Sequence, residues 1–385
     1  MRRISFGLAA VALVLVACGG EAVTPPATPA PPVATAPAPV ETAPAPVAEA
    51  PKAPQLSMPE MQKKTGEGIA AALNAHDAKK VASFYTENAV IKFAGAPDTT
   101  GRDAIEKMWA KNFEGVKSSK TSASRVWMKG DVAIVEWAWT GVHSGEMMGV
   151  KATEKPVGMM GVDVMWFSAD GLVKEQHTYA DMGTIASQIG ASKQKARAVP
   201  TLPASATAVV STNAAEETKN LEVSKKMFGA FEKKNDADFL GNSSDDIAWD
   251  DLSTPETMKG KAAGKKFFSD MTKAFPDVKV EPTNAWGIGD FVISENTMTG
   301  THKGAFMGVQ PTKKSVNLHS LDIIQMKDGK AVKGWTYANG GEMMTQLGLM
   351  PQPGAKPADA KPADPKAAPA KPADAKPATP AAPKK

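Results

Sequence analysis

The chain has 385 residues, of which 42% are hydrophobic and 22% charged, as is usual for a folded protein. Its net charge of +4 is too small to indicate nucleic-acid binding, and no basic stripe interleaved with aromatic residues is present. The single cysteine excludes an intrachain disulfide and a cysteine-based zinc site. The 30 prolines crowd toward the two ends, so the length allows about two domains flanked by non-globular segments.

The amino-terminal residues predict a lipid anchor. Arg2 and Arg3 precede an apolar run over residues 4–17, which suits a signal-peptide core and is too short to span a bilayer. The run ends Leu15-Val16-Ala17-Cys18, which resembles a bacterial lipobox. The resemblance implies removal of residues 1–17 and a lipid on Cys18, hence a membrane-anchored lipoprotein of the cell envelope, at the outer membrane or facing the periplasm where the cell has one. An ordinary signal peptide with an incidental cysteine is the alternative.

Three further segments lack a pattern that could form a core. Residues 18–58 are rich in alanine and proline and are expected to be an extended tether. Residues 191–216 are expected to link two domains, and residues 351–385 to form a disordered tail of lysine, proline and alanine.

Between these segments the sequence repeats itself. Glu136–Gly149 reads EWAWTGVHSGEMMG and Glu295–Gly308 reads ENTMTGTHKGAFMG, with matching residues 159 positions apart. A fixed period of this length indicates a duplicated domain. We therefore expect one domain over residues 59–190 and a second over residues 217–350.

Each copy opens with a helical pattern, then a short strand over 89–93 or 247–251, then a helix over 102–113 or 261–275. Alternation of apolar residues then predicts four strands in each copy, over residues 124–128, 132–140, 157–167 and 173–179, and over 278–286, 291–299, 315–326 and 331–337. Asp-Gly turns at Asp170 and Asp328 join the last two strands of each copy. Helices followed by strands predict an α+β domain, with helices on one face of a curved, mostly antiparallel sheet.

The second copy resembles the SnoaL-like polyketide cyclases, within the NTF2-like superfamily. The residues that carry this resemblance are Phe275-Pro276-Asp277, the Gly289-Asp290 turn, Gly300–Gly308, Pro311-Thr312, Asp328-Gly329-Lys330, Trp335 and Gln346-Leu347-Gly348. The resemblance implies two cone-shaped barrels, each enclosing an apolar pocket. It also implies that any catalysis would be proton transfer by an aspartate in that pocket, with neither metal nor cofactor.

The last strand of each copy carries the first set of candidate site residues. His177, Tyr179 and Asp181 share one face of the strand, because side chains alternate with a period of two. We interpret them as a catalytic group, with Asp181 as the base. The corresponding residues in the second copy are Trp335, Tyr337 and Asn339, which we interpret as ligand-binding. Asn339 corresponds to Asp181, and its amide cannot act as a carboxylate base. Enzyme activity is therefore the less favoured interpretation.

Other recurring residues extend the predicted pocket. Asp163 and Asp322 correspond to each other, as do His143 and His302, and Trp137 and Trp139 share a strand face. These six residues are candidates for ligand binding. The alternative is structural: buried carboxylates and histidines that are hydrogen-bonded to the backbone, and aromatic residues packed in the core, would give the same pattern.

Three functions fit the sequence. The first is a lipid-anchored module that binds a small apolar ligand or a protein partner. The second is a cofactor-independent cyclase or isomerase that uses Asp181. The third is a structural or assembly module without ligand. The two copies are also expected to pair with each other within the chain.

Overall fold

The computed structural model describes residues 56–195 and 197–350. The predicted signal peptide, Cys18, most of the tether and the C-terminal tail lie outside the described residues. Among the described residues, no helix is long and apolar enough to cross a membrane.

The first domain contains α1 (Met58–Ala75), α2 (Ala78–Ala82), β1 (Tyr85–Phe93), β2 (Thr99–Thr100), α3 (Arg102–Gly115), β3 (Lys120–Lys129), β4 (Val132–Val142), β5 (Pro156–Phe167), β6 (Val173–Ala180) and α4 (Met182–Ile189). Local chemistry sets several of these boundaries. Ser57 and Glu60 form a capping box that starts α1, and the Asp77 side chain accepts a hydrogen bond from the Lys80 amide to start α2.

The second domain repeats this order with α5 (Ala215–Lys233), α6 (Asp236–Gly241), β8 (Ser243–Asp251), β9 (Met258–Lys259), α7 (Gly260–Ala274), β10 (Lys279–Ile288), β11 (Phe291–Thr301), β12 (Ser315–Lys327), β13 (Lys330–Ala338) and α8 (Gly340–Gln346). Strands β10 to β13 lie where the alternation predicted them, whereas β9 was not predicted. The repeated sequence forms the end of β11 and the start of the loop to β12, as it does for β4 and β5 in the first domain.

Each domain has one mixed sheet, which confirms the predicted α+β class. The strand orders are β2-β1-β6-β5-β4-β3-β7 and β10-β11-β12-β13-β8-β9. The pairs β1–β6 and β8–β13 are parallel, whereas the long hairpins are antiparallel. Both sheets are open and not the closed barrels expected from the sequence, since each order runs from one edge strand to another and helices close the space in front of the sheet.

The segment expected to link the domains also takes part in the first sheet. Within it, β7 (Thr207–Val210) runs parallel to β3, with Trp127 opposite Val209. The chain therefore extends the edge of the first sheet before it enters α5.

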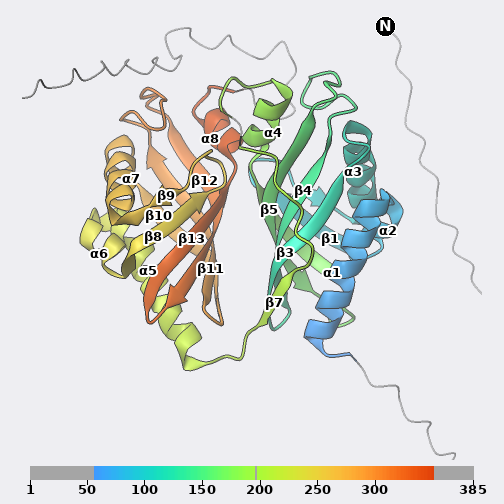
Figure 1. Ribbon diagram of the computed structural model, residues 1–385, viewed down its shortest axis with the longest axis horizontal. Coiled ribbons are helices and arrows are strands. Elements are labelled where there is room, and N and C mark those ends of the chain that lie inside the picture. Colours follow the sequence, from blue (N-terminus) through green and yellow to red (C-terminus); the bar gives the residue numbers. More distant parts are fainter. Residues whose placement is uncertain (1–55, 196, 351–385) are drawn as a thin grey trace, which may run out of the picture. The chain divides into compact units, whose positions relative to one another are not determined.

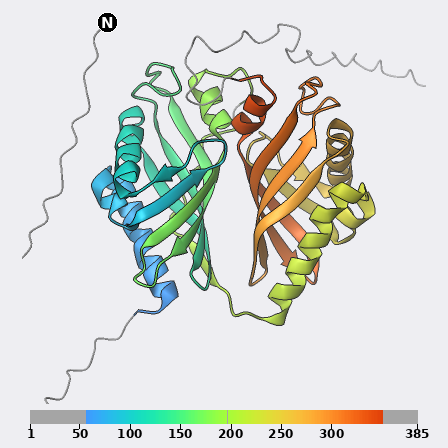
Figure 2. The same cartoon turned by 180° about the vertical axis from the view of Figure 1, so that it is seen from behind.

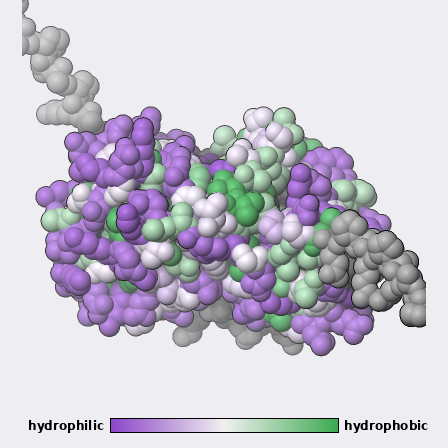
Figure 3. All heavy atoms as spheres, turned by 90° about the horizontal axis from the view of Figure 1, so that it is seen from below, coloured by the Kyte–Doolittle hydropathy of each residue, from purple (hydrophilic) through white to green (hydrophobic). Residues whose placement is uncertain are grey.

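The two faces of each sheet are covered differently. Helices α1–α3 cover one face of the first sheet, helices α5–α7 cover one face of the second, and the two remaining faces meet in the middle (Figures 1 and 2). The contact is one apolar cluster that includes Trp127, Val162 and Val164 from the first domain and Ile293, Leu321 and Ile323 from the second, all of which are fully buried. Figure 3 shows that hydrophilic residues cover most of one side of the protein and that apolar residues reach the surface near its centre. Hydrophobic burial thus joins the domains as well as holding each of them together.

Candidate functional site

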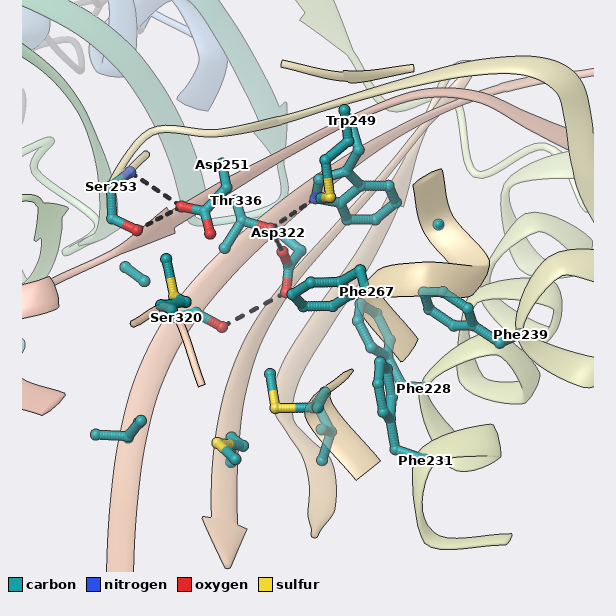
Figure 4. A pocket seen from close by; sticks show the side chains of 18 of the residues that line it. Phe228, Phe231, Phe239, Trp249, Asp251, Ser253, Phe267, Ser320, Asp322 and Thr336 are labelled. Carbon is teal, nitrogen blue, oxygen red and sulfur yellow. Dashed lines mark hydrogen bonds between the residues drawn. The ribbon is translucent and has the colours of Figure 1, made fainter. Parts of the chain in front are cut away.

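A cavity of about 200 Å³ lies in the second domain, between helices α5–α7 and the sheet face that they cover (Figure 4). We call it the domain 2 pocket. Most of its wall is apolar. Its aromatic lining residues are Phe228, Phe231, Phe239, Trp249, Phe267, Phe275 and Phe306.

Asp322, a candidate from the sequence, lines this pocket, and its carboxylate is held by side chains from the two neighbouring strands β11 and β13. The Thr336 hydroxyl donates to Oδ1, and Asn296 Nδ2 donates to Oδ2 over 2.7 Å. Trp249 Nε1 donates in turn to the Thr336 hydroxyl over 2.8 Å, which fixes the ring beside the acid (Figure 4). Burial raises the pKa of Asp322 to about 7, despite these donors. The group can therefore gain or lose a proton near neutral pH.

A second carboxylate, Asp251, lines the same pocket at the end of β8. Its Oδ1 accepts hydrogen bonds from the amide (2.9 Å) and the hydroxyl (2.7 Å) of Ser253. Burial raises the pKa of Asp251, and the charge of Asp251 in turn helps to raise the pKa of Asp322. The sequence analysis missed this residue. The alternation of Ile247, Trp249 and Asp251 along one strand face could have revealed it.

The first domain has the corresponding acid but different surroundings. Asp163 accepts a hydrogen bond from the Thr178 hydroxyl over 2.7 Å, and burial raises its pKa to about 6. Trp137 takes the place of Asn296, and its ring lies so close to Gly161 that a Cβ there would be 2.3 Å away. Phe93 is paired with Thr178 as Asp251 is paired with Thr336. Aromatic side chains thus take the positions that Asn296 and Asp251 hold in the second domain.

Trp139, the other predicted tryptophan, packs against an apolar cluster around Val116 and Ile185. It contributes there to the packing of α4 against β5.

The structure places His177, Tyr179, Trp335 and Tyr337 between the two sheets and outside the lining of the domain 2 pocket. The Tyr179 hydroxyl donates to Glu295 Oε1 over 2.9 Å, and the Tyr337 hydroxyl donates to Glu136 Oε1 over 2.7 Å. The two domains therefore exchange the same tyrosine–glutamate hydrogen bond. His177 and Tyr179 share one face of β6, and Trp335 and Tyr337 share one face of β13. In each domain, however, this is the face that contacts the other domain.

The remaining partners of these glutamates differ between the domains. His177 Nδ1 is 2.6 Å from Glu295 Oε1, whereas Glu136 pairs with Arg125, whose guanidinium lies 3.8 Å from the ring centroid of Trp335. Burial opposes the charged imidazole, but the hydrogen bond and charge of Glu295 prevail and raise the pKa of His177. The contacts between the two sheets are thus charged as well as apolar.

Asp181 and Asn339 act as helix caps. Asp181 accepts hydrogen bonds from the amides of Gly183 and Thr184 at the start of α4, and from the amide of Gly340 in the other domain over 3.0 Å. Asn339 caps α8 and donates to the carbonyl of Ala94 over 2.8 Å, although it also lines the domain 2 pocket. With its oxygens occupied in this way, Asp181 is poorly placed to act as a base in the first domain.

His143 and His302 are completely buried and lie outside the lining of the domain 2 pocket. Their Nδ1 atoms contact the hydroxyls of Thr153 (3.0 Å) and Thr312 (3.2 Å), across the loops that follow β4 and β11. Both histidines therefore hold these loops in shape. In the described part of the chain, no group of three or more histidine, aspartate or glutamate side chains is placed to hold a metal ion.

Comparison with known families identifies both halves of the chain. The SnoaL-like polyketide cyclase family matches residues 226–347, and a SnoaL-like domain matches residues 67–176. None of the curated proteins matches.

Many solved structures resemble the chain, and each covers about one domain. AclR from Streptomyces galilaeus is 28% identical, with a TM-score of 0.32 over 35% of this chain and 99% of its own. IdmH from Streptomyces antibioticus is 24% identical, with a TM-score of 0.31 over 34% of this chain and 98% of its own. TsrD from Streptomyces laurentii is 17% identical, with a TM-score of 0.33 over 36% of this chain and 100% of its own. From the two family matches, the chain carries two SnoaL-like domains in tandem.

Proposed function

We propose that the second domain binds a small apolar molecule with one polar group, and that the first domain acts mainly as its structural partner. The observation that supports this proposal is the aromatic cavity of about 200 Å³, which is lined by the buried carboxylate of Asp322 and the half-buried carboxylate of Asp251. An apolar cavity of about 150 Å³ can hold benzene, and drug-sized ligands occupy roughly 300 Å³ or more. The volume therefore favours a ligand of one or two rings.

Native mass spectrometry of the protein purified from its source tests this proposal. We expect a small molecule to remain bound to the wild-type protein and to be lost when Gly264, which lines the pocket from α7, is replaced by leucine. A protein that carries no molecule from its source and binds none from a library of small aromatics would favour the structural role without ligand.

A second candidate function is proton transfer, as in a cyclase or isomerase. It is supported by the pKa of Asp322, which burial raises to about 7, because a general acid–base works best near the ambient pH. Asp322 would take the catalytic role that the sequence analysis gave to Asp181, with Asp251 beside it. Asp322→Asn should then abolish turnover of a bound substrate while the substrate still binds, whereas a pure binding module would show no turnover in either form.

We further propose that Cys18 is lipidated and holds the protein at a membrane of the cell envelope. The support is the sequence alone, in which the one cysteine follows the apolar run. Replacing Cys18 by serine should move the protein from the membrane fraction to the soluble fraction. Unchanged fractionation would contradict the anchor.

A further inference from the structure

We propose that the ligand of the domain 2 pocket is a small organic cation. Asp251 binds its ammonium group, and the aromatic wall of the pocket holds its apolar part. This inference rests on the proposed binding function and adds the chemical class of the ligand. It is based on the charge of the pocket, the free side of one carboxylate and the rings beside it.

Acidic side chains outnumber basic ones in the pocket lining, whose one histidine is His319. Asp251, Asp322 and Glu342 are among the described residues that line it, and no lysine or arginine is. Glu342 is already paired with His319, whose Nδ1 lies 2.7 Å from Glu342 Oε1. An anionic ligand would be repelled by the other two carboxylates, whereas a cation would relieve the repulsion between them.

Of these two carboxylates, Asp251 is the one that can accept a further donor. Asp322 receives hydrogen bonds from Thr336 on one oxygen and from Asn296 on the other. Asp251 receives both of its bonds, from Ser253, on Oδ1, and its Oδ2 has no partner among the described residues. The nearby Arg197 guanidinium donates its hydrogen bonds to Asp250 (2.6 Å) and to the carbonyl of Thr254 (2.8 Å), so that it acts on Asp251 through its charge alone.

Aromatic rings and a flexible thioether share the pocket and the adjoining hollow with Asp251, and the hollow is also lined by Lys266 and Asp270. Phe267 and Phe306 line the domain 2 pocket together with Asp251, and these three residues also line the adjoining hollow, along with Met307. The face of an aromatic ring attracts a cation by about 0.5–2 kcal/mol, more where water is excluded. A pocket lined by aromatic rings and this carboxylate is therefore a suitable site for an alkylated ammonium group.

A matched pair of probes tests the inference on the unmodified protein. Benzyltrimethylammonium and neopentylbenzene have the same shape, but only the first carries a positive charge. Titration monitored by tryptophan fluorescence should show at least tenfold tighter binding of the cation. Asp251→Asn should remove that preference for the cation. Asp245→Asn should keep it, because Asp245 is an exposed carboxylate elsewhere on the same strand.

The outcomes separate this inference from the proposed function. Equal affinity for the two probes, or tighter binding of neopentylbenzene, overturns the cation and leaves an apolar pocket in place. Binding of neither probe also overturns the cation, and the molecule retained in native mass spectrometry then decides the proposed function on its own.

Discussion

Asp322 shows how the position of one carboxyl group in the fold gives it an unusual acidity. It is 5% exposed, and its hydrogen-bond donors do not offset the loss of water, so its pKa lies well above the ordinary value of 3.8. The folded protein therefore holds this proton more tightly than the unfolded chain. The contribution of this group to stability is complete below about pH 4 and is lost as the pH rises through about 7.

Asp322→Asn should remove the loss of stability that accompanies deprotonation of this carboxyl group. We expect the free energy of unfolding of the variant, relative to wild type, to increase between pH 4 and pH 8 by on the order of 1–3 kcal/mol. Urea titrations at several pH values measure this difference. Asp245, which is exposed and whose pKa is lowered by its bond to Lys261, provides the control, since Asp245→Asn should give a slope of the opposite sign. A flat difference for Asp322→Asn would contradict the raised pKa.

At the scale of the elements, the sequence predicted the strands well but not the environment of their faces. Alternation correctly placed His177 and Tyr179 on one face of β6 and Trp335 and Tyr337 on one face of β13. It could not say which face forms the pocket, because helices bury one face of each sheet and the other domain buries the opposite face. Both faces are consequently rich in apolar and aromatic residues, and their composition does not distinguish them.

The close contact between β13 and β8 gives a prediction at this scale. A Cβ at Gly334 would lie 2.3 Å from the ring of Trp249, and that ring is held by its bond to Thr336. Gly334→Ala should therefore destabilise the protein by about 1–3 kcal/mol and weaken ligand binding as the ring is displaced. Gly229→Ala is the matched control, because Gly229 lies inside α5 with open space around it, and the alanine should stabilise by about 0.5–1 kcal/mol. Equal melting temperatures for the two variants would refute the steric argument.

At the scale of the whole molecule, the duplication could be deduced from the sequence, whereas the contact between the copies could be expected only in outline. No local pattern reveals that Glu136 meets Tyr337, since the two residues lie 201 positions apart and become partners only when the sheets meet. The open form of the sheets and the strand β7 were missed for the same reason, because both depend on contacts between distant segments.

Tyr337→Phe tests how much the domain contact contributes to stability. The change removes the hydroxyl that donates to Glu136, a residue only 2% exposed, and leaves that oxygen without its donor. The free energy of unfolding should fall by about 1–3 kcal/mol, and Tyr179→Phe should have a smaller effect, because His177 still contacts Glu295 Oε1. Lys225→Ala, which breaks an exposed pair with Glu222, should change it by less than about 0.5 kcal/mol. A Tyr337→Phe effect as small as that of the control would mean that the domains do not depend on this bond.

The reciprocal tyrosine–glutamate bonds have a consequence for how such a protein can evolve. In a homodimer built on the same contact, every substitution appears in both subunits, so a bulky residue that closes one cavity closes the other. Here both partners are encoded in one chain, and Trp137 can occupy one domain while Asn296 remains in the other. Covalent linkage thus permits specialisation of the halves, with one domain free to become a permanent support for the other.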